Sequence, residues 1–304
     1  MQLFIHFLGT GGSWPTIQRN VSAIAIKRGG EIILFDCGEG TQRQFQKSKL
    51  SYMQITKIFI THFHGDHFLG LPGFIQTLQL NDREQPLHIY GPVGTKKIVD
   101  TIIHLGYFKP SYEIFAYDLK GNEEIKFEEY KIKCTKACHN VPSLAYSLIE
   151  NERPGKFNKE KALKLGIPEG RLFSKLQKGE TIEINGKIIK PSMVLGKPRP
   201  GRKITITGDT MPCKNIIKIA EKSDVLIHDA TFDSSMEERA KEYGHSTAMQ
   251  AAIIAKMANV EKLYLTHISP RYKNAKLLEE EARQIFPNSY VANDFMEVEV
   301  KLKK

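Results

Sequence analysis

Short runs rich in isoleucine, phenylalanine and valine alternate along the chain with runs whose apolar residues recur every three or four positions. The short runs are bounded by glycine, asparagine or proline and predict strands at residues 2–8, 21–27, 31–36, 57–61, 130–136, 143–149, 203–207, 224–229, 262–267 and 296–302. The helical spacing predicts helices at residues 39–47, 70–80, 95–105, 247–257 and 275–285. This mixture predicts an α/β protein. The first strands follow one another without a repeated strand-then-helix unit, which argues against a regular Rossmann or barrel array.

The overall composition is that of an ordinary globular protein. The 304 residues are 41% hydrophobic and 26% charged, which excludes a collagenous, low-complexity or wholly disordered chain. No window approaches the roughly 18 consecutive apolar residues of a membrane span, and the first residues contain no basic leader. We therefore expect a cytoplasmic protein without a membrane segment.

The positive charge is concentrated in one segment. The chain has 44 Lys plus Arg against 34 Asp plus Glu, a net charge of +10, and residues 151–178 alone contain eight Lys or Arg and three Glu. Three glycines and two prolines interrupt a short helical pattern there, which predicts an inserted, partly ordered arm. Such an excess favours an anionic partner such as nucleic acid, but a solvated surface loop is an equally ordinary explanation.

The four cysteines do not form a disulfide framework, because they are too few and too scattered for a chain of this length. We expect reduced thiols. Cys134, Cys138 and His139 are spaced as half of a zinc finger, but no second Cys or His pair stands at the required spacing.

The densest cluster of reactive side chains follows the predicted strand at residues 57–61. His62, His64, Asp66 and His67 lie within six residues, and Gly65 permits a tight turn between them. Imidazole is the commonest neutral ligand of zinc, and core packing has no use for such a cluster. Since His62 and His64 can point the same way from an extended backbone while the later pair follows the turn, the spacing predicts two adjacent metal ions.

This stretch matches the H-x-H-x-D-H motif of the metallo-β-lactamase superfamily, which the chain therefore resembles. The resemblance implies an αββα sandwich of two mixed sheets flanked by helices, formed as a single domain by residues 1–304. It also implies that His139 completes the first metal site, that Asp209 bridges both ions, and that His267 completes the second site.

Three further stretches resemble ribonuclease Z, the tRNA 3′-processing endonuclease, in its short form. They are the opening FLGTGG with PTIQRNVS, the segment GHST at residues 244–247, and the segment HDATF that precedes it. The resemblance implies cleavage of the 3′ trailer from precursor tRNA, leaving a 3′-hydroxyl on the tRNA and a 5′-phosphate on the trailer. It also implies two zinc ions per subunit and a homodimer.

Residue roles follow from the same resemblance. Asp66 is expected to orient or deprotonate the attacking water, and His245 to donate a proton to the leaving oxygen with Asp229 orienting it. The ordinary alternative for His245 is a place beside a helix N-cap at Ser246. The arm at residues 151–178 occupies the position of the family's tRNA-binding insertion. The expected RNA contacts are Arg19, Asn20, Lys156, Lys159, Lys161, Lys164 and Arg171.

Two positions depart from the family pattern. Ile17 stands where the opening loop commonly has a lysine, and Gly170-Arg171 replaces the usual Gly-Pro turn of the arm.

Other functions on the same fold are alternatives to the ribonuclease. An arylsulfatase-like enzyme or a cyclic-nucleotide phosphodiesterase would share every metal ligand but has no use for the arm. A non-catalytic RNA chaperone has no use for the ligand set. Trp14, beside the expected cleft, is the aromatic residue of most interest.

Overall fold

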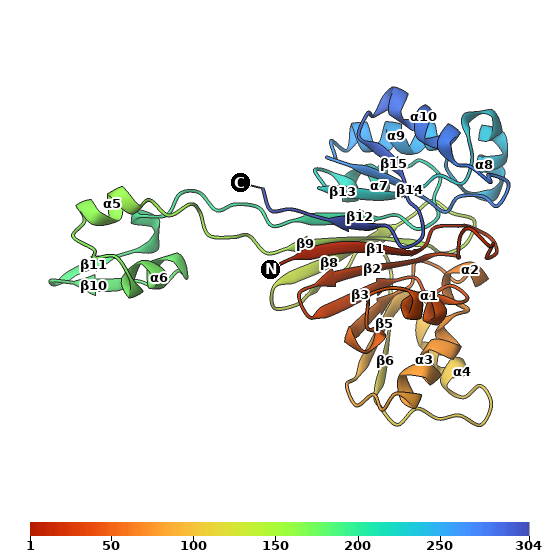
Figure 1. Ribbon diagram of the computed structural model, residues 1–304, viewed down its shortest axis with the longest axis horizontal. Helices are drawn as coiled ribbons and strands as arrows, with labels where there is room; N and C mark the ends of the chain where they lie inside the picture. The colour runs from red at the N-terminus through yellow and green to blue at the C-terminus, as the bar shows by residue number, and fades with distance from the viewer. Residues whose placement is uncertain (304) are drawn as a thin grey trace. The chain divides into compact units, whose positions relative to one another are not determined.

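The computed structural model describes residues 1–303 and divides the chain into two compact units (Figure 1). The main unit comprises residues 1–127, 131–149 and 203–301. The second unit comprises residues 128–130, residues 150–202 and the C-terminal residues from Leu302. Among the described helices, none combines the length and the apolar character needed to cross a membrane.

The first sheet of the main unit has seven strands in the order β16-β1-β2-β3-β4-β5-β6. Their bounds are β1 Leu3–Gly9, β2 Ala23–Arg28, β3 Glu31–Phe35, β4 Ile55–Phe59, β5 Leu87–Pro92, β6 Ile114–Leu119 and β16 Glu297–Glu299. Pairing is antiparallel from β16 to β3 and parallel from β3 to β6. The chain before β6 also forms α1 Thr41–Lys47, η1 Tyr52–Gln54, α2 Gly65–Phe68, α3 Leu71–Leu80 and α4 Thr95–Ile103.

The second sheet also has seven strands, in the order β15-β14-β13-β12-β9-β8-β7. Their bounds are β7 Glu124–Lys126, β8 Tyr130–Lys136, β9 Leu144–Glu150, β12 Lys203–Ile206, β13 Val225–Asp229, β14 Leu263–Thr266 and β15 Ser289–Val291. Strands β12 to β15 are parallel, whereas β9 is antiparallel to β12. The elements between them are α7 Lys214–Ala220, η3 Ser234–Met236, α8 Glu237–Tyr243, α9 Ala248–Met257 and α10 Lys276–Ile285.

The two sheets of the main unit pack face to face, with helices on their outer sides (Figure 1). Between the sheets, the ring of Phe59 contacts Phe35 and Tyr146, with ring centroids 5.4 and 5.2 Å apart, and the Tyr146 hydroxyl donates to the Ile60 carbonyl at 2.7 Å. Outside the second sheet, α9 turns small alanines such as Ala251 toward the strands, which permits close packing. The predicted αββα sandwich of two mixed sheets is confirmed.

The second unit contains the predicted basic arm and is larger than predicted. It consists of α5 Lys159–Lys164, α6 Arg171–Gln177, the hairpin β10 Ile182–Ile184 and β11 Lys187–Ile189, and η2 Pro191–Met193. Its own small core is formed by Ala162, Ile167, Leu176, Ile182, Ile189 and Val194. The predicted end at residue 178 followed the run of charges. The hairpin beyond it and Val194 supply half of the apolar residues that the two helices need, so the unit extends to Arg202.

Candidate metal centre

Five of the seven predicted ligands lie just after strands of the two facing sheets, and Asp66 and His67 lie in the short helix α2. His62 and His64 follow β4, whereas His139, Asp209 and His267 follow β8, β12 and β14 of the other sheet. The backbone before Asp209 comes so close to the β4 end that a Cβ on Gly208 would lie 2.7 Å from Thr61. Gly208 also has a φ of +60°, so glycine is required there and lets the Asp209 loop reach the histidines.

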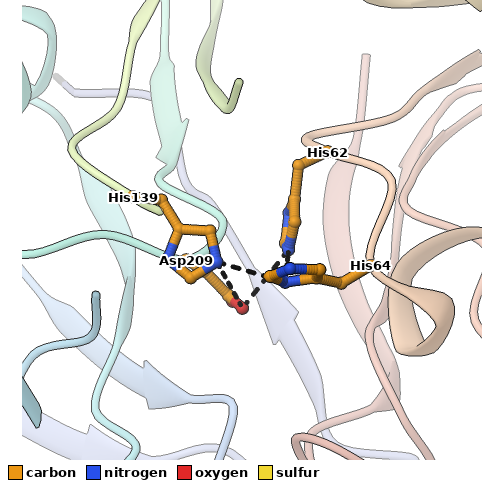
Figure 2. A group of neighbouring side chains, drawn as sticks. All are labelled: His62, His64, His139 and Asp209. Carbon is orange, nitrogen blue, oxygen red and sulfur yellow. Dashed lines mark hydrogen bonds and ion pairs between the residues drawn. The ribbon is translucent and has the colours of Figure 1, made fainter. Parts of the chain in front are cut away.

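The first cluster consists of three imidazoles and one carboxylate that point toward one another (Figure 2). The Nδ1 atom of His64 lies 3.1 Å from Nε2 of His62 and 3.2 Å from Nε2 of His139. The Oδ2 atom of Asp209 lies 3.5 Å from His62 Nε2 and 4.0 Å from His139 Nε2. The four side chains therefore present their ligand atoms to one common point.

A second cluster shares the same Asp209 oxygen. The Nε2 atoms of His67 and His267 each lie 3.4 Å from Asp209 Oδ2. Asp66 Oδ2 lies 3.1 Å from His267 Nε2 and 3.7 Å from His67 Nε2. One oxygen of Asp209 therefore faces both groups of candidate ligands.

The donor set fits zinc. A tetrahedral ion with its ligand atoms about 2.0–2.2 Å away keeps those atoms roughly 3.3–3.6 Å from one another, close to the separations in both clusters. Asp209 Oδ1 and His67 Nε2 are fully buried and have no hydrogen-bond partner among the described residues. Because buried polar atoms are almost always bonded, these atoms indicate a site for cations.

Hydrogen bonds fix the orientation of the ligand rings. Nδ1 of His67 lies 2.7 Å from Asp36 Oδ2, and Nδ1 of His139 donates to the Gly244 carbonyl at 2.7 Å. Nδ1 of His267 lies 2.8 Å from the Thr231 hydroxyl. A ligand histidine usually engages its other nitrogen in this way. None of these three partners was predicted from the sequence.

The charges of the cluster are interdependent. Burial lowers the pKa of His62 well below its usual value, and the neighbouring His67 lowers it further. Burial raises the pKa of Asp209, but the charges of His267 and His67 outweigh that effect and hold it well below its usual value. The neutral His62 ring and the ionised Asp209 carboxylate are the forms in which these two groups bind a metal. Burial lowers the pKa of His67, but Asp209 and Asp36 outweigh it and raise that pKa well above its usual value, so His67 must lose a proton when it binds an ion.

His245 lies at the edge of this cluster and outside its tightest contacts. Its Nδ1 atom is 2.9 Å from Asp229 Oδ2 and 3.9 Å from Asp209 Oδ2. Burial lowers the pKa of His245, but the charge and hydrogen bond of Asp229 dominate and raise it to about 9. Asp229 is itself fixed by the backbone N–H groups of Thr210 and Thr231. The geometry thus pairs His245 with the predicted Asp229 and favours a protonated ring at neutral pH.

The alternative for His245, a place beside a cap at Ser246, is only partly correct. The N-cap of α9 is Thr247, which forms a reciprocal capping box with Gln250. The Ser246 hydroxyl instead donates to the Thr210 carbonyl at 2.6 Å. The cap was misplaced by one residue because serine and threonine have the same capping chemistry.

The zinc-finger alternative is wrong. The Cys134 thiol is buried in β8 and bonds to Glu123. Cys138 contacts Cys213, and His139 belongs to the metal cluster.

The predicted RNA contacts lie in two different environments. The Arg19 guanidinium donates to Thr10 Oγ1 and to the Ala292 carbonyl, and the Asn20 side chain donates to the Glu39 carbonyl. These bonds hold the opening loop, so both residues have a structural role, and their contact with RNA stays a prediction. The arm residues are all exposed: Lys156, Lys159, Lys161, Lys164 and Arg171.

Comparison with known proteins identifies the family. Ribonuclease Z of Methanosarcina acetivorans is 50% identical over 98% of each chain, and that of Methanosarcina mazei is 48% identical over 98% of each. The chain belongs to the ribonuclease Z family. The crystal structure of human tRNase Z, short form, is 31% identical, has a TM-score of 0.72, and matches over 97% of this chain and 98% of the human one.

A second match covers half of the chain. The model of the family described as Anti-Pycsar protein Apyc1 matches residues 3–154, which thus belong to that family as well. This range includes the four-ligand motif and His139, but it ends before Asp209, His245 and His267. The ribonuclease Z relatives span the whole chain and thus all of these positions. They confirm the predicted family, the predicted fold and the predicted endoribonuclease activity in tRNA 3′ processing.

Proposed function

We propose that this ribonuclease Z removes the 3′ trailer from precursor tRNA at a centre of two zinc ions, leaving a 3′-hydroxyl on the tRNA and a 5′-phosphate on the trailer. The observation that supports it most directly is the shared Asp209 oxygen, which lies 3.4–4.0 Å from four histidines of two clusters with His245 beside them. When bound, the ions supply a hydroxide at neutral pH and offset charge on the phosphoryl oxygens.

The side chains around the cluster would perform the remaining steps. Asp66 is fixed between the His267 ring and the Ser13 backbone N–H, which donates to its Oδ2 atom at 2.7 Å. Burial raises the pKa of Asp66, but its contacts with His267 and His67 keep it below the usual range. An ionised carboxylate held in this way orients a water for attack. On the other side, the protonated His245 gives its proton to the departing oxygen.

The second unit would supply affinity for tRNA. Residues 150–202 contain thirteen Lys or Arg and six Glu, most of the excess positive charge of the chain. Cations at a distance from the scissile bond bind phosphates and position the duplex without acting on the bond. The arm therefore distinguishes a tRNA-processing enzyme from a hydrolase of small phosphodiesters on the same fold.

One assay separates these activities. The protein is incubated with end-labelled precursor tRNA and, separately, with a small chromogenic phosphodiester, each with and without a chelator. We expect a single cleavage at the 3′ end of the tRNA that the chelator abolishes and added zinc restores. Phosphatase sensitivity of the labelled trailer tests for the 5′-phosphate. Hydrolysis of the small substrate without cleavage of the precursor would contradict the proposal and favour the phosphodiesterase alternative.

Three further properties belong to the proposal by analogy with the family. They are the identity and number of the ions, assembly as a homodimer, and a cytoplasmic location. Metal analysis of the purified protein tests for two zinc ions per chain. A mass measurement in solution tests the dimer, and a monomeric mass would contradict it.

A further inference from the structure

The loop between β1 and β2 is attached to the metal centre at its beginning. Gly12 lies so close to the His267 ring that a Cβ at this position would be 2.4 Å from it. The next residue, Ser13, donates its backbone N–H to Asp66 Oδ2. The loop therefore touches two candidate ligands of the second cluster, and Trp14 is the next residue along the chain.

The backbone at this point is held in an unfavourable conformation that directs Trp14 outward. Ser13 has a φ of +70°, in the left-handed region that residues with a Cβ seldom adopt. The bond to Asp66 and a turn in which the Trp14 N–H donates to the Gly12 carbonyl at 2.9 Å maintain it. Strain of this kind concentrates at functional sites.

The Trp14 side chain has no packing role that explains it. It is the sole tryptophan of the chain and is 61% exposed. Within residues 1–303 it makes no aromatic or cation–π contact, and Ile17, in the same loop, is 99% exposed. A single exposed aromatic residue is unremarkable on most surfaces. Beside a phosphodiester-cleaving centre, an unpartnered indole offers a platform for a nucleobase.

Positive charge lines a groove whose lining begins at Pro15, the residue after Trp14. The loop and α1 line a groove of about 640 Å³, into which α1 contributes Arg43 and Lys47, one helical turn apart. Over the described part of the chain, neither side chain has an ion pair or hydrogen bond. Of the two acids that line the groove, Asp294 accepts bonds from the Thr10 and Asn20 backbone, and Glu39 is exposed. Two unengaged cations in a groove that begins one residue after an exposed indole match a single RNA strand, whose phosphates bind cations and whose bases stack on aromatic rings.

We propose that Trp14 stacks on an unpaired nucleotide adjacent to the scissile phosphate, while Arg43 and Lys47 bind phosphates of the same strand. This inference rests on the proposed function and adds a positioning role for Trp14. Because every base has an aromatic face, the stacking fixes the strand at the metal centre without selecting a sequence.

The first test compares Trp14→Ala with Trp14→Phe on precursor tRNA. Stacking on one base predicts that Trp14→Ala lowers kcat/KM by about 5- to 150-fold, whereas Trp14→Phe retains most of the activity. Metal content and thermal unfolding should be unchanged in both variants, which excludes a fault in folding or metal binding. Tyr107→Ala is the matched control, since Tyr107 is a fully exposed aromatic residue of the same unit.

The second test locates the stacked base. Precursors with an abasic nucleotide on either side of the scissile bond are cleaved by the wild type and by Trp14→Ala. At one of the two positions, removal of the base should lower the cleavage rate of the wild type. The same removal should leave the already reduced rate of Trp14→Ala unchanged. RNA binding should also change the fluorescence of the single tryptophan.

Several outcomes would overturn the inference. One is cleavage by Trp14→Ala at the rate of the wild type. Another is that the abasic changes at both positions lower cleavage by Trp14→Ala as much as they lower cleavage by the wild type. A third is that Trp14→Ala changes only the mass of the protein in solution, which would place a second copy of the chain on Trp14. A wild type that does not cleave the precursor refutes the proposed function instead, so the two failures are distinguishable.

Discussion

The candidate ligands of the main unit and the lysines of the second unit differ in how firmly each side chain is held. His67 is 1% exposed, bonds to Asp36 at 2.7 Å and faces Asp209 at 3.4 Å. Lys156 and Lys164, in contrast, are exposed and have no side-chain partner among residues 1–303, while Lys159 pairs only with the exposed Glu169. Chemistry at a point requires fixed atoms, whereas attraction to a polyanion requires only enough charge in one region.

This difference predicts different responses to substitution. In the metal cluster, each ligand side chain contacts several others, so the loss of one side chain removes a contact from all of them. In the second unit, each lysine contributes a separate increment.

The most damaging single change should be Asp209→Ala. Its Oδ2 atom faces both clusters, so its loss removes the one carboxylate that can bridge two ions. We expect no detectable cleavage of precursor tRNA and a lower metal content. Activity assays and metal analysis of the folded variant check this, and Asp100→Ala, which removes an exposed carboxylate paired with the exposed His104, is the control. A variant that keeps its metal and its turnover would show that Asp209 is not the bridge.

His245→Ala should separate catalysis from metal binding. His245 lies outside the tightest contacts of both clusters, so its removal should leave metal content near that of the wild type. Cleavage should fall by roughly 10²- to 10⁴-fold, the usual effect of losing a general acid. Asp229→Asn, which keeps the size of the orienting side chain, should give a smaller loss. Loss of metal from His245→Ala would instead identify His245 as a ligand.

Removal of the arm should weaken tRNA binding and spare small substrates. Arg153 and Arg199 pair through backbone hydrogen bonds of 2.8 and 2.9 Å, so replacing residues 156–196 by a short glycine linker keeps both ends of the insertion together. We expect the Kd for precursor tRNA to rise by roughly 10²-fold or more, since the deletion removes many cations that would bind phosphates. Hydrolysis of a chromogenic phosphodiester should be unchanged, and equal loss of both activities would indicate a folding defect.

The boundaries of that deletion come from the structure, because the sequence did not predict them. Charge density ended the predicted arm at residue 178, but Ile182, Ile189 and Val194 complete the core that Ala162 and Leu176 begin. A run of lysines indicates where charge is concentrated. It contains no information about which later apolar residues will cover the helices, so a deletion of residues 151–178 would leave half of a core exposed.

The candidate ligands, in contrast, could be named one by one from the sequence, and the structure brings their side chains together. Three histidines and an aspartate within six residues are rare in any core or turn, and the remaining ligands lie at strand ends in the order of the family. Asp36 and Thr231 were missed because a lone Asp or Thr near the end of a strand resembles an ordinary turn residue. Only the folded chain shows that they bond to His67 and His267.

The smallest effects are expected from neutralising lysines of the arm. Replacing Lys156, Lys161 and Lys164 by Gln one at a time should each weaken tRNA binding by only a few-fold, because each exposed side chain binds at most one phosphate. The contributions should add, since the three side chains share no partner among residues 1–303. Each lysine that binds a duplex phosphate should also, when replaced, flatten the dependence of log K on log salt by about 0.9.

Lys159 tests whether a lysine of the arm that already has an ion-pair partner contributes less to tRNA binding than a lysine without one. Its amine already lies 2.7 Å from Glu169 Oε1, so Lys159→Gln should change the salt dependence less than Lys156→Gln does. Glu169→Gln, which releases Lys159, should strengthen tRNA binding slightly, since exposed ion pairs are weak and easily exchanged. Lys96→Gln and Lys97→Gln, at exposed positions on α4 of the main unit, control for the change in net charge. If binding of precursor tRNA titrated against salt shows the same slope for every variant, the arm does not bind RNA through these side chains.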